Sequence, residues 1–315
     1  MPPEDVQDRA AGVLVGVACG DAIGRPVEFV SQTAVSEQFG TIDGPVDGGR
    51  PPRPAGTVTD DTELTLRTAR SLVDCHRLDP EDVSARFVDW LGSSPLDVGY
   101  LTRDVLEKIA AGKDWSLASY EASMQAPDGR DAGNGSLMRC TPIAVAFRAD
   151  PQSLVSGSRV ISAITHYDTR CQWSCALFNY IVAQLIRGDK PELTPFLQEY
   201  KHRLPSELQD GVSNWRATEP TYDSGYVIST LHAALYHGLT AESPREGICE
   251  SVNHGGDADT IGALTGALLG ARFGATAFPT AWVDTVSNTD AAITLSQRLL
   301  ALDFPAFSAE PYAID

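Results

Sequence analysis

The 315-residue sequence has few basic residues, no disulfide spacing among its cysteines and no long apolar run. Each of these absences argues against a class of protein. Its 24 Lys and Arg residues against 42 Asp and Glu residues give a net charge of −18, which disfavours a nucleic acid partner or an anionic membrane. The longest apolar runs, 10–19 and 261–271, are too short for a membrane span, so no membrane insertion is expected. The six cysteines lack a disulfide spacing and follow no signal peptide, which indicates the cytoplasm.

Several common catalytic signatures are also missing. The chain has no Gly-x-Ser-x-Gly elbow, no phosphate loop ending in Gly-Lys-Ser/Thr and no His-Glu-x-x-His motif. Strict alternation of apolar and polar residues, which is typical of strands, is scarce. Apolar residues instead recur at helical spacing, as in 64–73, 83–91 and 231–239. The pattern predicts an all-α protein.

Two glycine-rich segments are predicted to be the inner helices. Glycines recur every fourth residue at 12, 16 and 20 and again at 262, 266 and 270, so each helix would have a glycine stripe on one face. Each glycine costs roughly 0.8–1 kcal/mol of helix propensity relative to alanine, so close central packing should offset it. We expect the two helices to lie side by side. Residues 40–56, with five glycines and four prolines, are predicted to be a long loop, either a lid or a surface excursion.

Two acidic segments carry the strongest chemical signal: Thr59-Asp60-Asp61-Thr62 and Asp257-Ala258-Asp259-Thr260. Four carboxylates within about 4–6 Å repel one another by several kcal/mol per pair at an effective dielectric near 20, and a divalent cation relieves that repulsion. Carboxylate and hydroxyl oxygens suit Mg²⁺ or Mn²⁺ better than Zn²⁺. The alternative is that each segment only caps a helix, although capping requires one such residue rather than several.

Four further segments occur between or beside the acidic ones: 20–28 (GDAIGRPVE), 95–99 (PLDVG), 133–139 (GNGSLMR) and 165–168 (THYD). In this order the six motifs resemble the ADP-ribosylglycohydrolase family, over residues 9–274. The segments 95–99 and 224–226 (SGY) resemble most the branch that includes the dinitrogenase reductase-activating glycohydrolase and ADP-ribosylarginine hydrolases.

The resemblance implies a fold, an activity and a cofactor. The fold would be a compact, single-domain, orthogonal multi-helix bundle over residues 1–315, all-α, with a binuclear metal cleft that holds two Mg²⁺ or Mn²⁺ ions. The reaction would be hydrolysis of mono-ADP-ribose from a modified protein side chain, with arginine as the first choice of linkage. The partners would be an ADP-ribosylated protein as substrate and ADP-ribose as product, and we expect a monomer.

The same resemblance implies roles for individual residues. Asp97 and Glu28 would be the catalytic acids, with Asp97 facing the scissile N-glycosidic bond. The metal ligands would be Thr59, Asp60, Asp61, Asp257, Asp259 and Thr260. The substrate contacts would be Gly133, Asn134, Gly135, Ser136, His166 and Tyr226, with the glycine-rich run at the diphosphate and the tyrosine ring against adenine.

Other functions stay open at this stage. A non-catalytic, ADP-ribose-binding or structural descendant would be expected to lose metal ligands, whereas all six positions are present. A two-metal phosphohydrolase would act on phosphorus instead of an anomeric carbon. ADP-ribosyl-serine and O-acetyl-ADP-ribose are alternative substrates within the family. The choice between Mg²⁺ and Mn²⁺, the target protein and the order in which the acids act are not fixed by the sequence.

Overall fold

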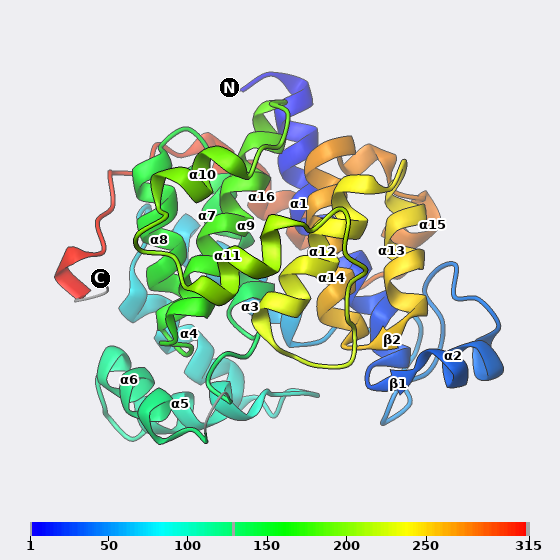
Figure 1. Ribbon diagram of the computed structural model, residues 1–315, viewed down its shortest axis with the longest axis horizontal. Helices are drawn as coiled ribbons and strands as arrows, with labels where there is room; N and C mark the ends of the chain where they lie inside the picture. The colour runs from blue at the N-terminus through cyan, green and yellow to red at the C-terminus, as the bar shows by residue number, and fades with distance from the viewer. Residues whose placement is uncertain (1, 128–129, 313–315) are drawn as a thin grey trace.

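The protein is helical throughout, as the sequence predicts. The computed structural model describes residues 2–127 and 130–312, and Figure 1 shows the order of the elements. In those residues the α-helices are α1 (Glu4–Gly24), α2 (Gln32–Phe39), α3 (Asp60–Cys75), α4 (Pro80–Gly92), α5 (Tyr100–Ala110), α6 (Trp115–Gln125), α7 (Thr141–Ala146), α8 (Pro151–Ala163), α9 (Thr169–Arg187), α10 (Thr194–Glu199), α11 (Ser206–Ser213), α12 (Val227–Thr240), α13 (Pro244–Asn253), α14 (Ala258–Phe273), α15 (Thr280–Thr285) and α16 (Thr289–Ala301). Over the same described residues, one small sheet pairs β1 (Val30–Ser31) with β2 (Gly255–Gly256).

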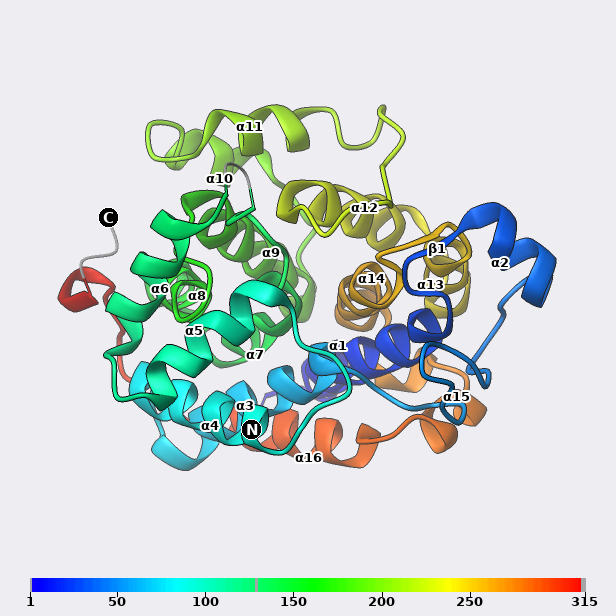
Figure 2. The same cartoon turned by 90° about the horizontal axis from the view of Figure 1, so that it is seen from below.

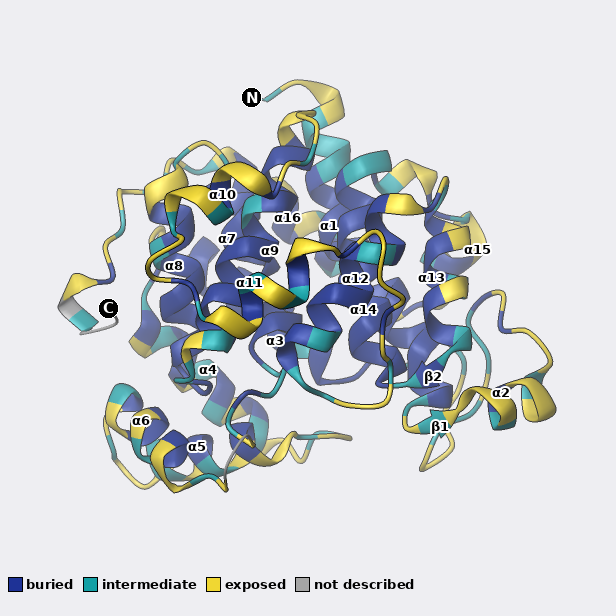
Figure 3. Ribbon diagram, in the orientation of Figure 1, coloured by how far each residue is buried: buried dark blue, intermediate teal, exposed yellow. Residues whose placement is uncertain are grey.

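The two glycine-striped helices, α1 and α14, form the centre of the molecule. A Cβ atom on Gly16 would lie 2.0 Å from the carbonyl oxygen of Gly266, and one on Gly20 would lie 1.9 Å from that of Gly262. Distances this short are far below van der Waals contact, so only glycine allows the backbones to approach so closely. The predicted close pair of inner helices is therefore confirmed. Figure 3 shows both helices as buried along most of their length.

Helix α1 also has the length and composition of a membrane span. Within the stretch from Glu4 to Val27, the most apolar 18-residue window has a mean hydropathy of 1.3, which passes the usual test by length and composition. The most apolar window of that stretch is entirely buried by the rest of the protein. Its apolar character is thus explained by its place in the core.

The ends of α1 and α14 are held together by the short sheet. Antiparallel β1 and β2 pair Val30 with Gly256 and Ser31 with Gly255. The segment that follows α1 therefore lies beside the segment that precedes α14. Figure 2, which looks at the molecule from below, shows α1 and α14 in the middle with α3, α9 and α12 around them.

The loop predicted at 40–56 lies between α2 and α3 and is held to the core. The side chain of Arg25, which is buried, donates hydrogen bonds to the carbonyl oxygens of Thr57 (3.1 Å) and Gly48 (3.0 Å). Gly48 and Arg53 form an antiparallel bridge within the loop. These contacts argue against a loose surface excursion, and the role of a lid stays a prediction.

Candidate active site

The two acidic segments come together where α3 and α14 begin. Asp60, Asp61, Asp257 and Asp259 are all buried, and Thr260 Oγ1 donates a hydrogen bond to Asp61 Oδ2 at 3.4 Å. That contact joins residues 199 positions apart in the chain. The close packing of α1 against α14, together with the β1–β2 pair, brings this about.

The alternative that these residues only cap helices does not fit the contacts. Thr59 stands at the N-cap of α3 and Asp257 at the N-cap of α14, and neither side chain makes a capping hydrogen bond. Other helices of this chain are capped in the usual way. Asp79 caps α4 and Asp150 caps α8 through backbone N–H groups. The acidic segments therefore have another role.

The pKa values of the four buried aspartates indicate what the two acidic segments require. Burial, followed by repulsion from neighbouring carboxylates, raises the pKa values of Asp60, Asp61 and Asp259 well above their usual range. Burial also raises the pKa of Asp257 to about 6. The Oδ1 atom of Asp61 is buried without a hydrogen-bond partner. Such a cluster is costly in its ionised form unless a cation compensates the charge.

The donor chemistry of the cluster fits a hard divalent cation, because all its donors are carboxylate or hydroxyl oxygens. Among residues 2–127 and 130–312, no three His, Cys, Asp or Glu side chains already form a metal-binding group. Some of the carboxylates are turned toward protein donors instead. Asp257 Oδ2 accepts from the amide of Asn134, and Asp259 Oδ1 accepts from the backbone N–H of Thr260 at 2.8 Å. The second carboxylate oxygen of each, Asp257 Oδ1 and Asp259 Oδ2, would be the one to bind a metal ion.

Asp21 organises the first acidic segment, and the sequence interpretation assigned it no role. Its carboxylate is fully buried at the end of α1. It accepts hydrogen bonds from the backbone N–H of Thr59 (2.9 Å) and its hydroxyl (2.9 Å), and from the backbone N–H of Thr62 (3.1 Å) and its hydroxyl (2.5 Å). Asp21 thus fixes the backbone on both sides of Asp60 and Asp61. The motif at 20–28 contains this residue, but only the fold reveals its partners.

A cavity of about 710 Å³ opens beside the acidic cluster. It collects most of the residues that the sequence singled out. Those that line it are Glu28, Asp60, Asp61, Asp97, Gly133, Asn134, Gly135, His166, Tyr226, Asp257, Asp259 and Thr260. Two of the proposed residues do not line it. The Ser136 hydroxyl is buried against that of Ser162 at 2.8 Å, and Thr59 borders a neighbouring, smaller cavity.

The two acids proposed as catalytic differ in their surroundings. Glu28 is half-buried just after α1, and burial, followed by the charges of Asp97 and Asp257, raises its pKa to about 8. Asp97 is exposed in the loop before α5, where its Oδ1 accepts a hydrogen bond from the N–H of Val98 at 2.8 Å. Both line the cavity, so the structure offers one acid that holds its proton near neutral pH and another that faces solvent.

The glycine-rich run at 133–136 is fixed against the start of α12. Gly133 forms an antiparallel bridge with Tyr226, and the N–H of Asn134 donates to the carbonyl oxygen of Gly225 at 2.9 Å. The amide of Asn134 donates to Asp257 and to the hydroxyl of Thr230 (3.0 Å). Asn134 therefore links this loop to the second acidic segment in addition to lining the cavity.

His166 is held in one orientation by a buried relay. The guanidinium of Arg139, itself fully buried, donates to Thr165 Oγ1 at 2.8 Å, and this hydroxyl lies 2.8 Å from His166 Nδ1. Because Thr165 Oγ1 accepts from Arg139, its proton is free for Nδ1, which favours the tautomer with hydrogen on Nε2. Burial lowers the pKa of His166 to about 3, so the ring is neutral. Its Nε2 lies beside the glycine-rich run, where a Cβ on Gly133 would be 3.4 Å away.

The fold and site together define a helical protein with a cavity beside two carboxylate segments that are distant in the sequence. The ADP-ribosylglycohydrolase family model matches residues 2–307, and the chain therefore belongs to the ADP-ribosylglycohydrolase family.

Individual relatives agree with this assignment. The chain is 32% identical to the ADP-ribosyl-[dinitrogen reductase] glycohydrolase of Rhodospirillum rubrum over 90% of this chain and 92% of the relative. It is 28% identical to the ADP-ribosylarginine hydrolase Tri1 of Serratia proteamaculans over 95% of this chain and 81% of the relative. A solved structure of an ADP-ribosylglycohydrolase-related protein complex superimposes with a TM-score of 0.82 at 31% identity and covers 96% of this chain and 100% of its own.

Proposed function

We propose that the protein hydrolyses mono-ADP-ribose from modified protein side chains, with ADP-ribosyl-arginine as its main substrate and two Mg²⁺ or Mn²⁺ ions as cofactors. The observation that carries the proposal is the buried cluster of four aspartates beside a cavity lined by Glu28, Asp97 and His166. The arginine linkage is supported by relatives whose names describe an ADP-ribosylarginine hydrolase and a dinitrogen reductase glycohydrolase.

The residues that would hold the ions are those of the two acidic segments: Thr59, Asp60, Asp61, Asp257, Asp259 and Thr260. Bound divalent cations would supply positive charge that neutralises the buried carboxylates and stabilises negative charge on the substrate. Asp21 would keep the first segment in place through its hydrogen bonds to Thr59 and Thr62.

The proton transfers would involve the two acids at the cavity. Water attacks the anomeric carbon of the distal ribose, and the bond between that carbon and the guanidino nitrogen breaks. Asp97 would donate a proton to the departing nitrogen, because guanidine leaves poorly unless it is protonated, and would take up the proton that the attacking water gives up. Glu28, whose raised pKa keeps it protonated near neutral pH, would orient the water or the ribose through a hydrogen bond. The new C–O bond yields ADP-ribose and an unmodified arginine side chain.

The remaining cavity residues would bind the ADP-ribose moiety. His166 would donate a hydrogen bond through Nε2–H to a phosphate or ribose oxygen. Gly133 and Gly135 carry no side chain of their own, which favours close approach of a diphosphate to their backbone. The Tyr226 ring offers a stacking surface for adenine, worth about 1–3 kcal/mol by analogy with base stacking on aromatic side chains.

The proposal is tested by mass spectrometry of ADP-ribose released from two proteins, one mono-ADP-ribosylated on arginine and one on serine. Release from the arginine substrate at a rate at least tenfold above that from the serine substrate is the expected result. The reverse preference would replace the arginine linkage with serine as the main substrate. Phosphate or nucleotide release from either substrate would point instead to a phosphohydrolase.

A further inference from the structure

A second, smaller cavity of about 200 Å³ adjoins the acidic one. The two cavities share Glu28, Phe29 and Asp97 as lining residues, so they meet where the proposed catalytic acids lie. Three arginines line the smaller cavity: Arg25, Arg50 and Arg53. In a chain with a net charge of −18, a cluster of three cations beside an acidic centre calls for an explanation.

The three arginines have different tasks. Arg25 is buried, and its guanidinium is occupied by backbone carbonyl groups of the loop that precedes α3. Arg50 and Arg53 are exposed, and within the residues that the structure describes their side chains make no hydrogen bond or ion pair. Two guanidinium groups are thus free to bind an anion.

The backbone keeps these two arginines at the cavity. Gly48 and Arg53 exchange backbone hydrogen bonds of 3.1 and 2.9 Å, which close the turn that contains Arg50. The turn lies directly against Arg25, because a Cβ on Gly49 would be 2.3 Å from the Nη1 atom of Arg25. The arginines are therefore presented by an anchored turn and not by a loose loop.

The position of the smaller cavity indicates what it meets. The glycine-rich run, His166 and Tyr226 line only the larger cavity, so the smaller one adjoins Asp97 on a side that none of them lines. Asp97 is the acid assigned to the departing guanidino group, so the protein that carries the modified side chain would lie on this side. The rim there is also apolar and accessible, since Phe29 is 70% and Leu96 45% exposed.

We propose that Arg50 and Arg53 bind a carboxylate of the protein substrate, from an Asp or Glu close to the modified residue, and so select substrates with an acidic neighbourhood. The inference rests on the proposed function. Arginine suits this task because its planar guanidinium pairs with a carboxylate through two parallel hydrogen bonds. The two cations also offset the repulsion that an incoming carboxylate would meet from Asp97 and Glu28.

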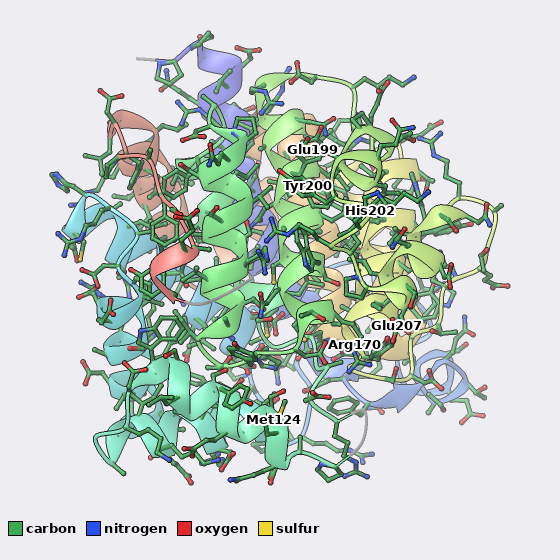
Figure 4. The ribbon with its side chains drawn as sticks, turned by 60° about the vertical axis from the view of Figure 1, so that its left-hand side comes forward. Met124, Arg170, Glu199, Tyr200, His202 and Glu207 are labelled. Carbon is green, nitrogen blue, oxygen red and sulfur yellow. The ribbon has the colours of Figure 1, made fainter. Side chains whose placement is uncertain are left out.

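The test compares two peptides that are ADP-ribosylated on arginine and differ only in Glu or Gln two residues away. The enzymes are the wild type, the double variant R50Q/R53Q, and a control double variant, K190Q/K201Q, that removes the same charge elsewhere. Lys190 follows α9 and is two residues after Gly188. A Cβ atom on Gly188 would lie 2.5 Å from Nη1 of Arg9, which is near the opposite end of α1 from Asp21. Lys201 follows α10 directly after Tyr200, and Figure 4 shows Tyr200 well above Arg170, which lies in the first turn of α9.

The wild type should favour the Glu peptide by about threefold to tenfold in kcat/KM at low salt, the range expected for two partly exposed ion pairs. R50Q/R53Q should lose most of this preference through KM, whereas K190Q/K201Q should keep it. In 0.5 M NaCl the wild-type preference should shrink toward unity because salt screens exposed charges.

Equal rates for the two peptides, or a preference that survives in R50Q/R53Q, would overturn this inference while leaving the proposed function standing. Free ADP-ribosyl-arginine, which carries no neighbouring residues, serves as the separate check of that function. Absence of release from it and from both peptides would overturn the proposed function and this inference together.

Discussion

The role assigned to Asp21 gives a prediction that can be worked from its contacts. Its carboxylate accepts from two backbone N–H groups and two hydroxyl groups of Thr59 and Thr62 while fully buried. In Asp21→Asn, the amide nitrogen that replaces one oxygen cannot accept a hydrogen bond. With the amide oxygen in the place of Oδ2, the backbone N–H groups of Thr59 and Thr62 and the hydroxyl of Thr62 keep their acceptor, but that acceptor is no longer charged. The hydroxyl of Thr59 can rotate to accept from the new NH2 group.

The expected cost follows from that count. A hydrogen bond to a charged group contributes about 1.5–3 kcal/mol and one to a neutral group about 0.5–1.5 kcal/mol, so each of the bonds that remain on the amide oxygen loses about 1 kcal/mol. We expect a loss of about 3 kcal/mol in the free energy of unfolding. With about 2.1 cal/mol/K of unfolding entropy per residue over 315 residues, this corresponds to a Tm about 5 °C lower. Metal affinity should fall by about 10–100-fold, the usual effect of removing a group that orients metal ligands.

Thermal denaturation without added metal and calorimetric titration with Mn²⁺ measure the two effects. The matched control is Asp74→Asn in the same helix, α3, where the side chain is 48% exposed and forms a surface ion pair with Arg86. That change should cost less than about 1 kcal/mol. A Tm within 1 °C of the wild type for Asp21→Asn, together with unchanged Mn²⁺ affinity, would show that Asp21 does not hold the first acidic segment in place.

Three further predictions concern catalysis, packing and pH. Asp97→Asn should slow ADP-ribose release by about 100-fold or more while keeping calorimetric metal binding, and turnover within twofold of the wild type would exclude its role as an acid. Gly16→Ala should lower the Tm by several degrees, because the new Cβ would lie 2.0 Å from the carbonyl oxygen of Gly266. In the control, Gly92→Ala, the new Cβ would meet no other side chain or backbone within 4 Å, so the Tm should not fall in this way. Burial lowers the pKa of His237 to about 4, so the unfolded chain binds the proton more readily. The neutral, buried ring of His237 should therefore contribute about 3 kcal/mol to the free energy of unfolding above pH 6.5, and this contribution should be lost as the pH falls toward 4. In denaturant titrations between pH 6.5 and pH 4, the free energy of unfolding should therefore fall by more in the wild type than in His237→Asn. An equal fall in the two proteins would contradict this prediction.

Much of the fold and of the site could be predicted from the sequence because the signals are local. Glycines at every fourth residue indicate a close helix pair wherever the partner helix lies, and an acidic run at a helix start is visible without a structure. The partners of Asp21 and the relay from Arg139 through Thr165 to His166 depend on contacts between distant segments. The inward orientation of Ser136 depends likewise on its packing against Ser162 and α9. Spacing along the chain carries no signal for such contacts.

The buried aspartate cluster should require divalent cations for cleavage of an ADP-ribosyl bond. This requirement can be measured as release of ADP-ribose from an arginine-modified protein by enzyme stripped with EDTA, followed by titration of Mn²⁺ or Mg²⁺ with calorimetry in parallel. The stripped enzyme should release no ADP-ribose, and release should recover as the ions bind. Release at the full rate by the stripped enzyme would contradict this requirement.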